Sequence, residues 1–198
     1  IYTGEDTLSL HDALPICASS RLGEAKQLLV YQGQSLLERS IRLAFSVCQE
    51  VLVCLGAEVD QSIRIVENLQ KEFPSISYVQ VEDWEKGMGE TLAVGLKAVD
   101  ISQDVMVLLC DLPFLNTSHL TNLTSLANPK RAIVASFQGV NSPPVLIPSA
   151  LRPLFDDWSG DQGLGKFWRQ NPMLCQIVHY SDKFRDVDVP EDREYWGI

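Results

Sequence analysis

Residues 51–81 have the sequence VLVCLGAEVDQSIRIVENLQKEFPSISYVQV, which predicts a strand, a helix and a second strand in turn. Residues 51–55 are continuously apolar and are followed by Gly56, a pattern typical of a strand that is covered on both faces. Apolar residues then recur at helical spacing over residues 59–73, and this pattern stops before Pro74. The unit therefore predicts an α/β fold with a mainly parallel sheet and helices on both faces.

The same alternation extends along the rest of the chain. Further helices are expected over residues 36–47, 87–99, 117–127 (capped by Thr117 or Ser118) and 150–157, through Trp168, and from Pro190. Further strands are expected over residues 77–81, 105–110, 132–137 and 174–180. The segment SPPVLIP, residues 142–148, is expected to be an edge strand or an extended segment, because each proline removes a donor from the sheet ladder.

The composition limits the class of protein. A chain of 198 residues, 45% hydrophobic and 21% charged, suits one globular domain. Its longest apolar run, residues 105–110, is far shorter than the roughly 20 residues that cross a bilayer. A net charge of −10 without a large basic cluster argues against a nucleic-acid partner. The 5 scattered cysteines form no C-x-x-C pair, so we expect buried thiols and a cytoplasmic protein.

The first residues do not fit the alternation. Residues 1–16, IYTGEDTLSLHDALPI, have neither helical nor strand periodicity and no basic region of a signal peptide. Part of this segment, LSLHDALPI, also resembles translated sequencing-adapter sequence. We expect residues 1–16 to be a non-native leader that replaces a native first strand, or else an irregular extension. Residues 17–198 are expected to form a single domain.

A polar loop at residues 17–29, CASSRLGEAKQLL, is the first candidate for a binding site. A turn rich in serine and glycine before a helix presents backbone N–H groups to an anion. Arg21 and Lys26 add two cations that could close on one phosphate chain. The alternative is a solvated loop with ordinary surface charges.

Carboxylates at two distant places could hold a divalent metal. Asp111 follows the most apolar expected strand, where an unpaired buried charge would be costly and Mg²⁺ could compensate it. The alternative is an aspartate that caps a helix or a turn before Pro113. Asp186 and Asp188 lie two residues apart in DVDVPED, so both side chains could share one face of an extended segment. The alternative is an acidic cluster at a helix N-terminus that the helix dipole stabilises, which already accounts for Glu191 and Asp192.

Other motifs exclude competing chemistries. GMGETLAVG, residues 87–95, lacks the third glycine of a dinucleotide fingerprint. His11, His119 and His179 are isolated, which argues against a zinc site. The loop serines have no histidine partner pattern, so a hydrolase triad has little support.

Several ordered motifs together resemble those of the nucleotidyltransferases related to molybdenum cofactor cytidylyltransferase and guanylyltransferase. SSRLGEAKQLL, residues 19–29, is similar to the family signature L-A-A-G-x-S-x-R-M-G followed by K-x-L-L. The further matches are VLVCLG (51–56), GMGETLAVGL (87–96), LLCDLPFL (108–115), PPVLIP (143–148), GDQGLGKFW (160–168) and DVDVPED (186–192). The likeness spans residues 17–196.

The resemblance implies a Rossmann-like, glycosyltransferase-A-type fold that transfers NMP from an NTP to a phosphorylated acceptor and releases pyrophosphate. By this likeness Arg21 and Lys26 would hold the triphosphate, Asp111 would be the principal Mg²⁺ ligand and Asp188 the second carboxylate. The remaining implied positions are Ser19, Gly23, Gly56, Gly87 and Gly89 for the nucleotide, and Gly160, Asp161 and Gly163 for the acceptor.

The cytidylyl branch is favoured, because GMGETLAVGL and GDQG resemble it more closely, so CTP is expected ahead of GTP and molybdopterin is the expected acceptor. One departure is Cys17, which stands where the family has a glycine that permits close backbone approach. Cys17 leaves open an alternative role as a catalytically impaired, nucleotide-binding accessory protein for a molybdoenzyme. A further alternative is transfer to a sugar phosphate or another small phosphorylated alcohol.

Overall fold

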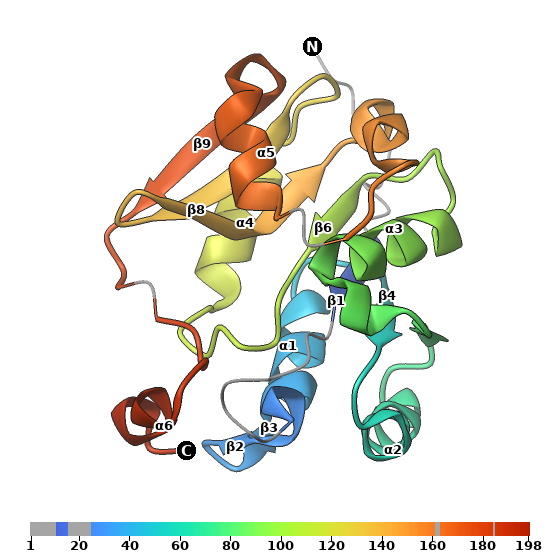
Figure 1. The fold of residues 1–198 in the computed structure, drawn as a ribbon, viewed down its shortest axis with the longest axis vertical. Helices are drawn as coiled ribbons and strands as arrows, with labels where there is room; N and C mark the ends of the chain where they lie inside the picture. Colours follow the sequence, from blue (N-terminus) through green and yellow to red (C-terminus); the bar gives the residue numbers. More distant parts are fainter. Residues whose placement is uncertain (1–10, 16–24, 161–162, 184) are drawn as a thin grey trace.

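In the part of the chain that the structure describes, seven strands form one sheet in the order β5-β4-β1-β6-β8-β7-β9 (Figure 1). The computed structural model describes residues 11–15, 25–160, 163–183 and 185–198. The sheet strands are β1 (His11–Pro15), β4 (Glu50–Leu55), β5 (Ile76–Gln80), β6 (Val105–Val107), β7 (Ala132–Phe137), β8 (Val140–Ile147) and β9 (Cys175–Tyr180). A separate small hairpin pairs β2 (Val30–Tyr31) with β3 (Gln34–Ser35).

Among the described strands of this sheet, only β8 runs against the others. It is antiparallel to both β6 and β7, whereas the pairs β1–β4, β1–β6, β4–β5 and β7–β9 are parallel. The carboxyl ends of β1, β4, β6 and β9 therefore meet at one edge of the sheet, where ligands of open α/β sheets usually bind. The mainly parallel mixed sheet expected from the sequence is confirmed.

Helices cover both faces of the sheet because the buried strands are apolar on both sides (Figure 1). In β4, Val51 and Val53 pack on one face and Leu52 and Cys54 on the other. The first face is covered by α1 (Leu36–Ala44), α2 (Val59–Gln70) and α4 (Thr117–Ser125). The second is covered by α3 (Met88–Ala98), α5 (Leu164–Gln170) and the 3₁₀ segment η3 (Ser149–Phe155).

The remaining helical elements are short. They are η1 (Lys26–Leu28), η2 (Trp84–Lys86), η4 (Pro172–Leu174) and the C-terminal helix α6 (Pro190–Trp196). No helix in the described ranges is long and apolar enough to span a membrane.

The expected leader contributes a strand. His11–Pro15 forms β1, an interior strand that pairs with β4 on one side and β6 on the other. The lack of strand periodicity in residues 1–16 therefore did not exclude a strand, because backbone hydrogen bonds to two neighbouring strands do not depend on alternating side chains. The rest of residues 1–16 lies outside the described residues.

The prediction of an edge strand at residues 142–148 is wrong. β8 lies between β6 and β7, and the sheet edges are β5 and β9. The register with β7 is interrupted between the pairs Val134–Val145 and Ser136–Asn141, and Pro143 and Pro144 fall inside this interruption. The prolines are tolerated inside the sheet because they lie where the ladder with β7 makes no regular pairs.

Two expected boundaries also need correction. The strand expected over residues 105–110 ends at Val107, and the apolar residues after it continue into the loop that carries Asp111. The cap of α4 is Asn116, rather than Thr117 or Ser118. Its side chain accepts hydrogen bonds from the backbone N–H groups of Ser118 and His119, at 3.0 and 3.4 Å, which satisfies donors that the helix leaves free.

Arg152 is buried in the core, where its side chain caps the C-terminal end of α3. The residue is 2% exposed and its guanidinium donates to four carbonyl groups. These belong to Leu96, Val99, Asp100 and Gln103. Burial lowers the pKa of this guanidinium, although nearby aspartates oppose the shift.

We expect Arg152→Met to destabilise the fold by about 3 kcal/mol, because the carbonyls would stay buried without donors. Urea unfolding monitored by circular dichroism measures this change. Loss of less than about 1 kcal/mol would mean that water replaces the guanidinium and that the buried hydrogen bonds do not stabilise the helix end.

Candidate active site

Lys26 joins two aspartates that lie far away in the sequence. Its Nζ is 3.3 Å from Oδ2 of Asp111 and 2.7 Å from Oδ1 of Asp188. These three residues follow β1, β6 and β9, whose carboxyl ends share one edge of the sheet. Burial lowers the pKa of Lys26, but Asp111 and Asp188 outweigh it and the net shift is upward, so the ammonium stays charged.

Asp111 is the more deeply placed carboxylate. Its side chain is 13% exposed, and burial raises its pKa even though Lys26 opposes the shift. Its Oδ1 is buried and has no hydrogen-bond partner among the described residues. A buried carboxylate oxygen without a donor is costly, so this atom is suited to a cation ligand.

The backbone around Asp188 is fixed from two sides. The N–H of Val187 donates to the carbonyl of Asp111 at 3.0 Å, which holds the two carboxylate-bearing segments together. The N–H groups of Asp188 and Val189 donate to Oδ2 of Asp192, at 3.0 and 2.9 Å, at the start of α6. Asp192 was interpreted from the sequence only as a charge favoured by the helix dipole; it also orients the backbone of Asp188.

Asp186 is the third carboxylate near Lys26. Burial is the main cause that raises its pKa, and its charge in turn raises the pKa of Asp111. Within the described part of the chain, Lys26 forms ion pairs with Asp111 and Asp188. The geometry therefore favours Asp188 over Asp186 as the second carboxylate of the site.

Gln27 is a site residue that the sequence analysis missed. It is fully buried, and its Nε2 donates to the carbonyl of Ala57 at 2.8 Å. This bond ties the segment after β1 to the loop after β4, so Lys26 projects from an anchored backbone. The polar residue inside K-x-L-L was the available signal, but nothing in the sequence indicated its partner.

The predicted nucleotide glycines have packing roles that can be seen directly. A Cβ at Gly56 would lie 2.7 Å from side-chain atoms of Trp84. A Cβ at Gly89 would lie 2.6 Å from the carbonyl oxygen of Gly160, and the N–H of Gly89 donates to that oxygen at 3.0 Å. The turns predicted for the nucleotide and for the acceptor are thus in contact at the start of α3.

Backbone conformation explains one of the two remaining described glycines predicted for the site, Gly87, but packing does not explain the other, Gly163. Gly87 has φ of 123°, a backbone conformation that favours glycine, at the N-cap of α3. Gly163 is the N-cap of α5 and a Cβ there would meet nothing within 4 Å, so packing alone does not explain this glycine.

Some predicted site residues lie outside the described residues: Cys17, Ser19, Arg21, Gly23 and Asp161. Within the described ranges, no group of three or more His, Cys, Asp or Glu residues has the arrangement of a metal site. The described cysteines, Cys48, Cys54, Cys110 and Cys175, are buried thiols.

This arrangement suits chemistry on a phosphate chain. It brings one buried ammonium and two carboxylates to the carboxyl edge of an α/β sheet, where ligands of open α/β sheets usually bind. Phosphoryl-type transfer mainly requires positioned cations, which lysine and a carboxylate-bound metal can both supply.

The comparisons with known proteins agree with this class. Residues 18–174 match the MobA-like NTP transferase domain, and the chain belongs to this family. It is 31% identical over 182 residues to a protein named nicotine blue oxidoreductase from Paenarthrobacter nicotinovorans, covering 87% of each chain.

Solved structures with low identity share the fold. The Rv0371c protein of Mycobacterium tuberculosis, solved in complex with manganese, has a TM-score of 0.75 at 16% identity, covering 95% of this chain and 97% of that one. The inositol-1-phosphate CTP transferase of T. maritima has a TM-score of 0.72 at 12% identity, covering 98% and 96%. The expected nucleotidyltransferase fold is confirmed.

The link between Asp192 and the Asp188 backbone predicts a pH effect on stability. Burial opposes ionisation of Asp192, but bonds from Asp188, Val189 and Arg185 outweigh it and lower its pKa from 3.8. Its stabilising contribution is therefore complete well above pH 3.8 and is lost as the pH falls through the lowered folded-state pKa. Asp192→Asn should cost about 1 kcal/mol near neutral pH and nothing in strong acid. Urea unfolding of the original protein and of Asp192→Asn, from neutral pH to strong acid, measures the difference in their free energies of unfolding. A difference that does not change with pH would show that the carboxylate charge has no role.

Proposed function

We propose that this protein transfers NMP, preferably CMP, from an NTP to a phosphorylated acceptor, with molybdopterin or the molybdenum cofactor as the first candidate and Mg²⁺ as the metal. The observation that carries the proposal is the placement of Lys26 between Asp111 and Asp188. The transferase class comes from the family. The nucleobase and acceptor follow the motif resemblance of residues 87–96 and 160–163.

The carboxylates fit a divalent metal. Asp111 offers a buried Oδ1 without a donor among the described residues, and Asp188 offers a partly exposed carboxylate beside it. Carboxylates together with substrate phosphates are the usual Mg²⁺ ligands. When bound there, Mg²⁺ would neutralise charge on the phosphates. The manganese complex of the Rv0371c protein supports this assignment by analogy of fold.

Lys26 and Asp111 would have complementary tasks in the transfer. An acceptor phosphate oxygen bonds to the α-phosphorus of the NTP, the bond to the bridging α–β oxygen breaks, and pyrophosphate leaves. Lys26 would turn from the carboxylates to the triphosphate and stabilise the negative charge that develops on pyrophosphate. Asp111 and Asp188 would hold the metal, whose positive charge would replace that of Lys26 beside them. Arg21 is assigned the same phosphate-binding task from the sequence motif.

Pyrophosphate release tests the proposal. The purified chain is incubated with CTP, GTP or ATP, Mg²⁺ and one acceptor at a time, either molybdopterin, inositol 1-phosphate or another sugar phosphate. We expect release that depends on both CTP and molybdopterin. Release with inositol 1-phosphate alone would support the sugar-phosphate alternative. Absence of release with every acceptor and nucleotide would refute a transferase activity of this chain.

Two other candidate functions rest on specific observations. Identity of 31% to a protein named nicotine blue oxidoreductase favours an oxidoreductase role, which an assay of nicotine blue reduction with added electron donors would test. Cys17 in place of the family glycine favours an impaired accessory protein. Nucleotide binding without turnover, even after residues 1–17 are replaced by a native family start, would support the accessory role.

We also place the protein in the cytoplasm. The buried thiols of the described cysteines support this placement, because such thiols are typical of reducing compartments.

A further inference from the structure

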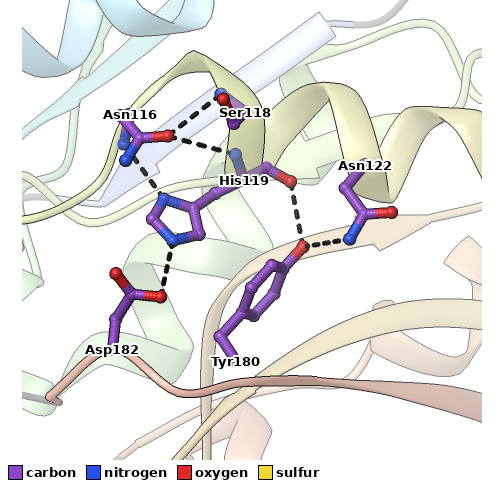
Figure 2. Close-up of polar contacts among 6 residues, drawn as sticks. All are labelled: Asn116, Ser118, His119, Asn122, Tyr180 and Asp182. Carbon is purple, nitrogen blue, oxygen red and sulfur yellow. Dashed lines mark hydrogen bonds and ion pairs between the residues drawn. The ribbon is translucent and has the colours of Figure 1, made fainter.

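His119 connects the two segments that carry the site aspartates. It is the third residue of α4 and is 4% exposed. Its Nδ1 accepts a hydrogen bond from the backbone N–H of Asn116 at 3.2 Å, and its Nε2 lies 3.3 Å from Oδ2 of Asp182 (Figure 2). Because a backbone N–H can only donate, Nδ1 is the acceptor and Nε2 carries the proton that bonds to Asp182.

The two partners of this ring belong to different parts of the chain. Asn116 ends the loop from β6, which carries Asp111, and Asp182 lies in the connection from β9 to α6, which carries Asp188. This connection comprises residues 181–183 and 185–189 in the described chain. It contacts the Asp111 loop a second time where the N–H of Val187 donates to the carbonyl of Asp111.

The contact with Asp182 exceeds what a helix cap requires. Capping uses Nδ1 and the Asn116 side chain, and both would remain if Asp182 were absent. The ring is held in orientation by Phe137 and Tyr180, whose ring centroids lie 5.6 and 4.8 Å away. Nε2 is thereby directed at a carboxylate that is 45% exposed and would otherwise be hydrated.

We propose that His119 and Asp182 are positioning residues that hold the connection carrying Asp188 against the loop carrying Asp111. Their bond sets the distance between the two carboxylates on either side of Lys26. The effect on metal binding rests on the proposed function; the effect on the Val187–Asp111 contact does not.

Hydrogen exchange at the Val187 amide tests the positioning without any assay of activity. In Asp182→Ala, we expect this amide to exchange about tenfold faster relative to amides of β7, because the connection opens more often. Asp182→Asn keeps an acceptor for Nε2–H and should restore most of the protection.

Tyr180→Phe is the matched control. The Tyr180 hydroxyl donates to the carbonyl of His119 at 3.1 Å and accepts from Asn122 at 3.3 Å (Figure 2). Its removal also breaks bonds between α4 and the chain near Asp182, but not the bond that holds the connection. Equal acceleration in both variants, or unchanged exchange in Asp182→Ala, would overturn the inference.

Binding of Mn²⁺ by calorimetry gives the second readout. We expect Asp182→Ala to weaken Mn²⁺ binding about tenfold, and in a working transferase to raise the metal requirement while kcat at saturating metal stays close to the original value. Faster exchange with unchanged Mn²⁺ affinity would overturn the link to the metal site. Altered exchange and affinity in a protein that releases no pyrophosphate would refute the proposed function and leave the positioning role standing.

Discussion

Asp111→Asn is expected to reduce pyrophosphate release at least about a hundredfold, because the amide keeps the shape of the side chain but removes the charge that would hold the metal. The fold should survive, since Asn fills the same space and relieves a carboxylate whose pKa is raised by burial. Steady-state kinetics over a range of Mg²⁺ concentrations measure the loss. We expect it to persist at saturating Mg²⁺.

Asp186→Asn and Asp188→Asn are the matched comparisons for this prediction. All three changes remove one negative charge near Lys26, but Asp188 makes the 2.7 Å ion pair and Asp186 acts at longer range. Asp188→Asn should therefore impair turnover much more than Asp186→Asn. An Asp111→Asn protein with ordinary activity would show that this carboxylate is a structural group.

Lys26→Met is expected to lower stability in a way that a divalent metal offsets, and to weaken nucleotide binding. Without metal, the two carboxylates lose the cation between them, and we expect a loss of about 3 kcal/mol in the free energy of unfolding. Mn²⁺ should stabilise this variant more than the original protein, because a divalent ion replaces the missing charge. The KM for the NTP should nevertheless rise about a hundredfold, since the triphosphate loses its ammonium partner. Thermal unfolding with and without Mn²⁺, together with nucleotide kinetics, measures these effects.

Lys86→Met provides the control for removal of a lysine. Lys86 pairs with Asp83 at 2.7 Å, but both side chains are largely exposed, so the pair should contribute little to stability. If Lys26→Met behaved like this control, with equal stability and no extra response to Mn²⁺, the buried ion pairs would not be part of a metal site.

The sequence was most informative where a single pattern settled an element. β4 was expected from a continuous apolar run, and α2 from apolar residues at helical spacing. Both elements lie within a few residues of their expected bounds. β8 was wrongly expected at the edge of the sheet. Its prolines predict lost hydrogen bonds to a neighbouring strand, but they do not show that the pairing with β7 is irregular at the same place. The position of β1 depends on pairing with β4 and β6, which no local pattern encodes.

The site was predictable as residue types, but not as contacts. Lys26 and Asp111 stood out by their motifs, and the sheet topology then brought them together across 85 positions of the chain. The spacing of Asp186 and Asp188 left both open, the family resemblance chose Asp188, and the ion pair of Asp188 with Lys26 agrees with that choice. His119 looked isolated because its partner, Asp182, lies 63 residues away on a separate segment.

Anomalous diffraction from crystals grown with Mn²⁺ and a CTP analogue that cannot be cleaved between the α- and β-phosphates tests the central arrangement most directly. We predict one manganese peak bonded to the carboxylates of Asp111 and Asp188, with the Lys26 ammonium turned to the triphosphate. A peak bound elsewhere, or a nucleotide bound away from these residues while Lys26 keeps both ion pairs, would contradict the account.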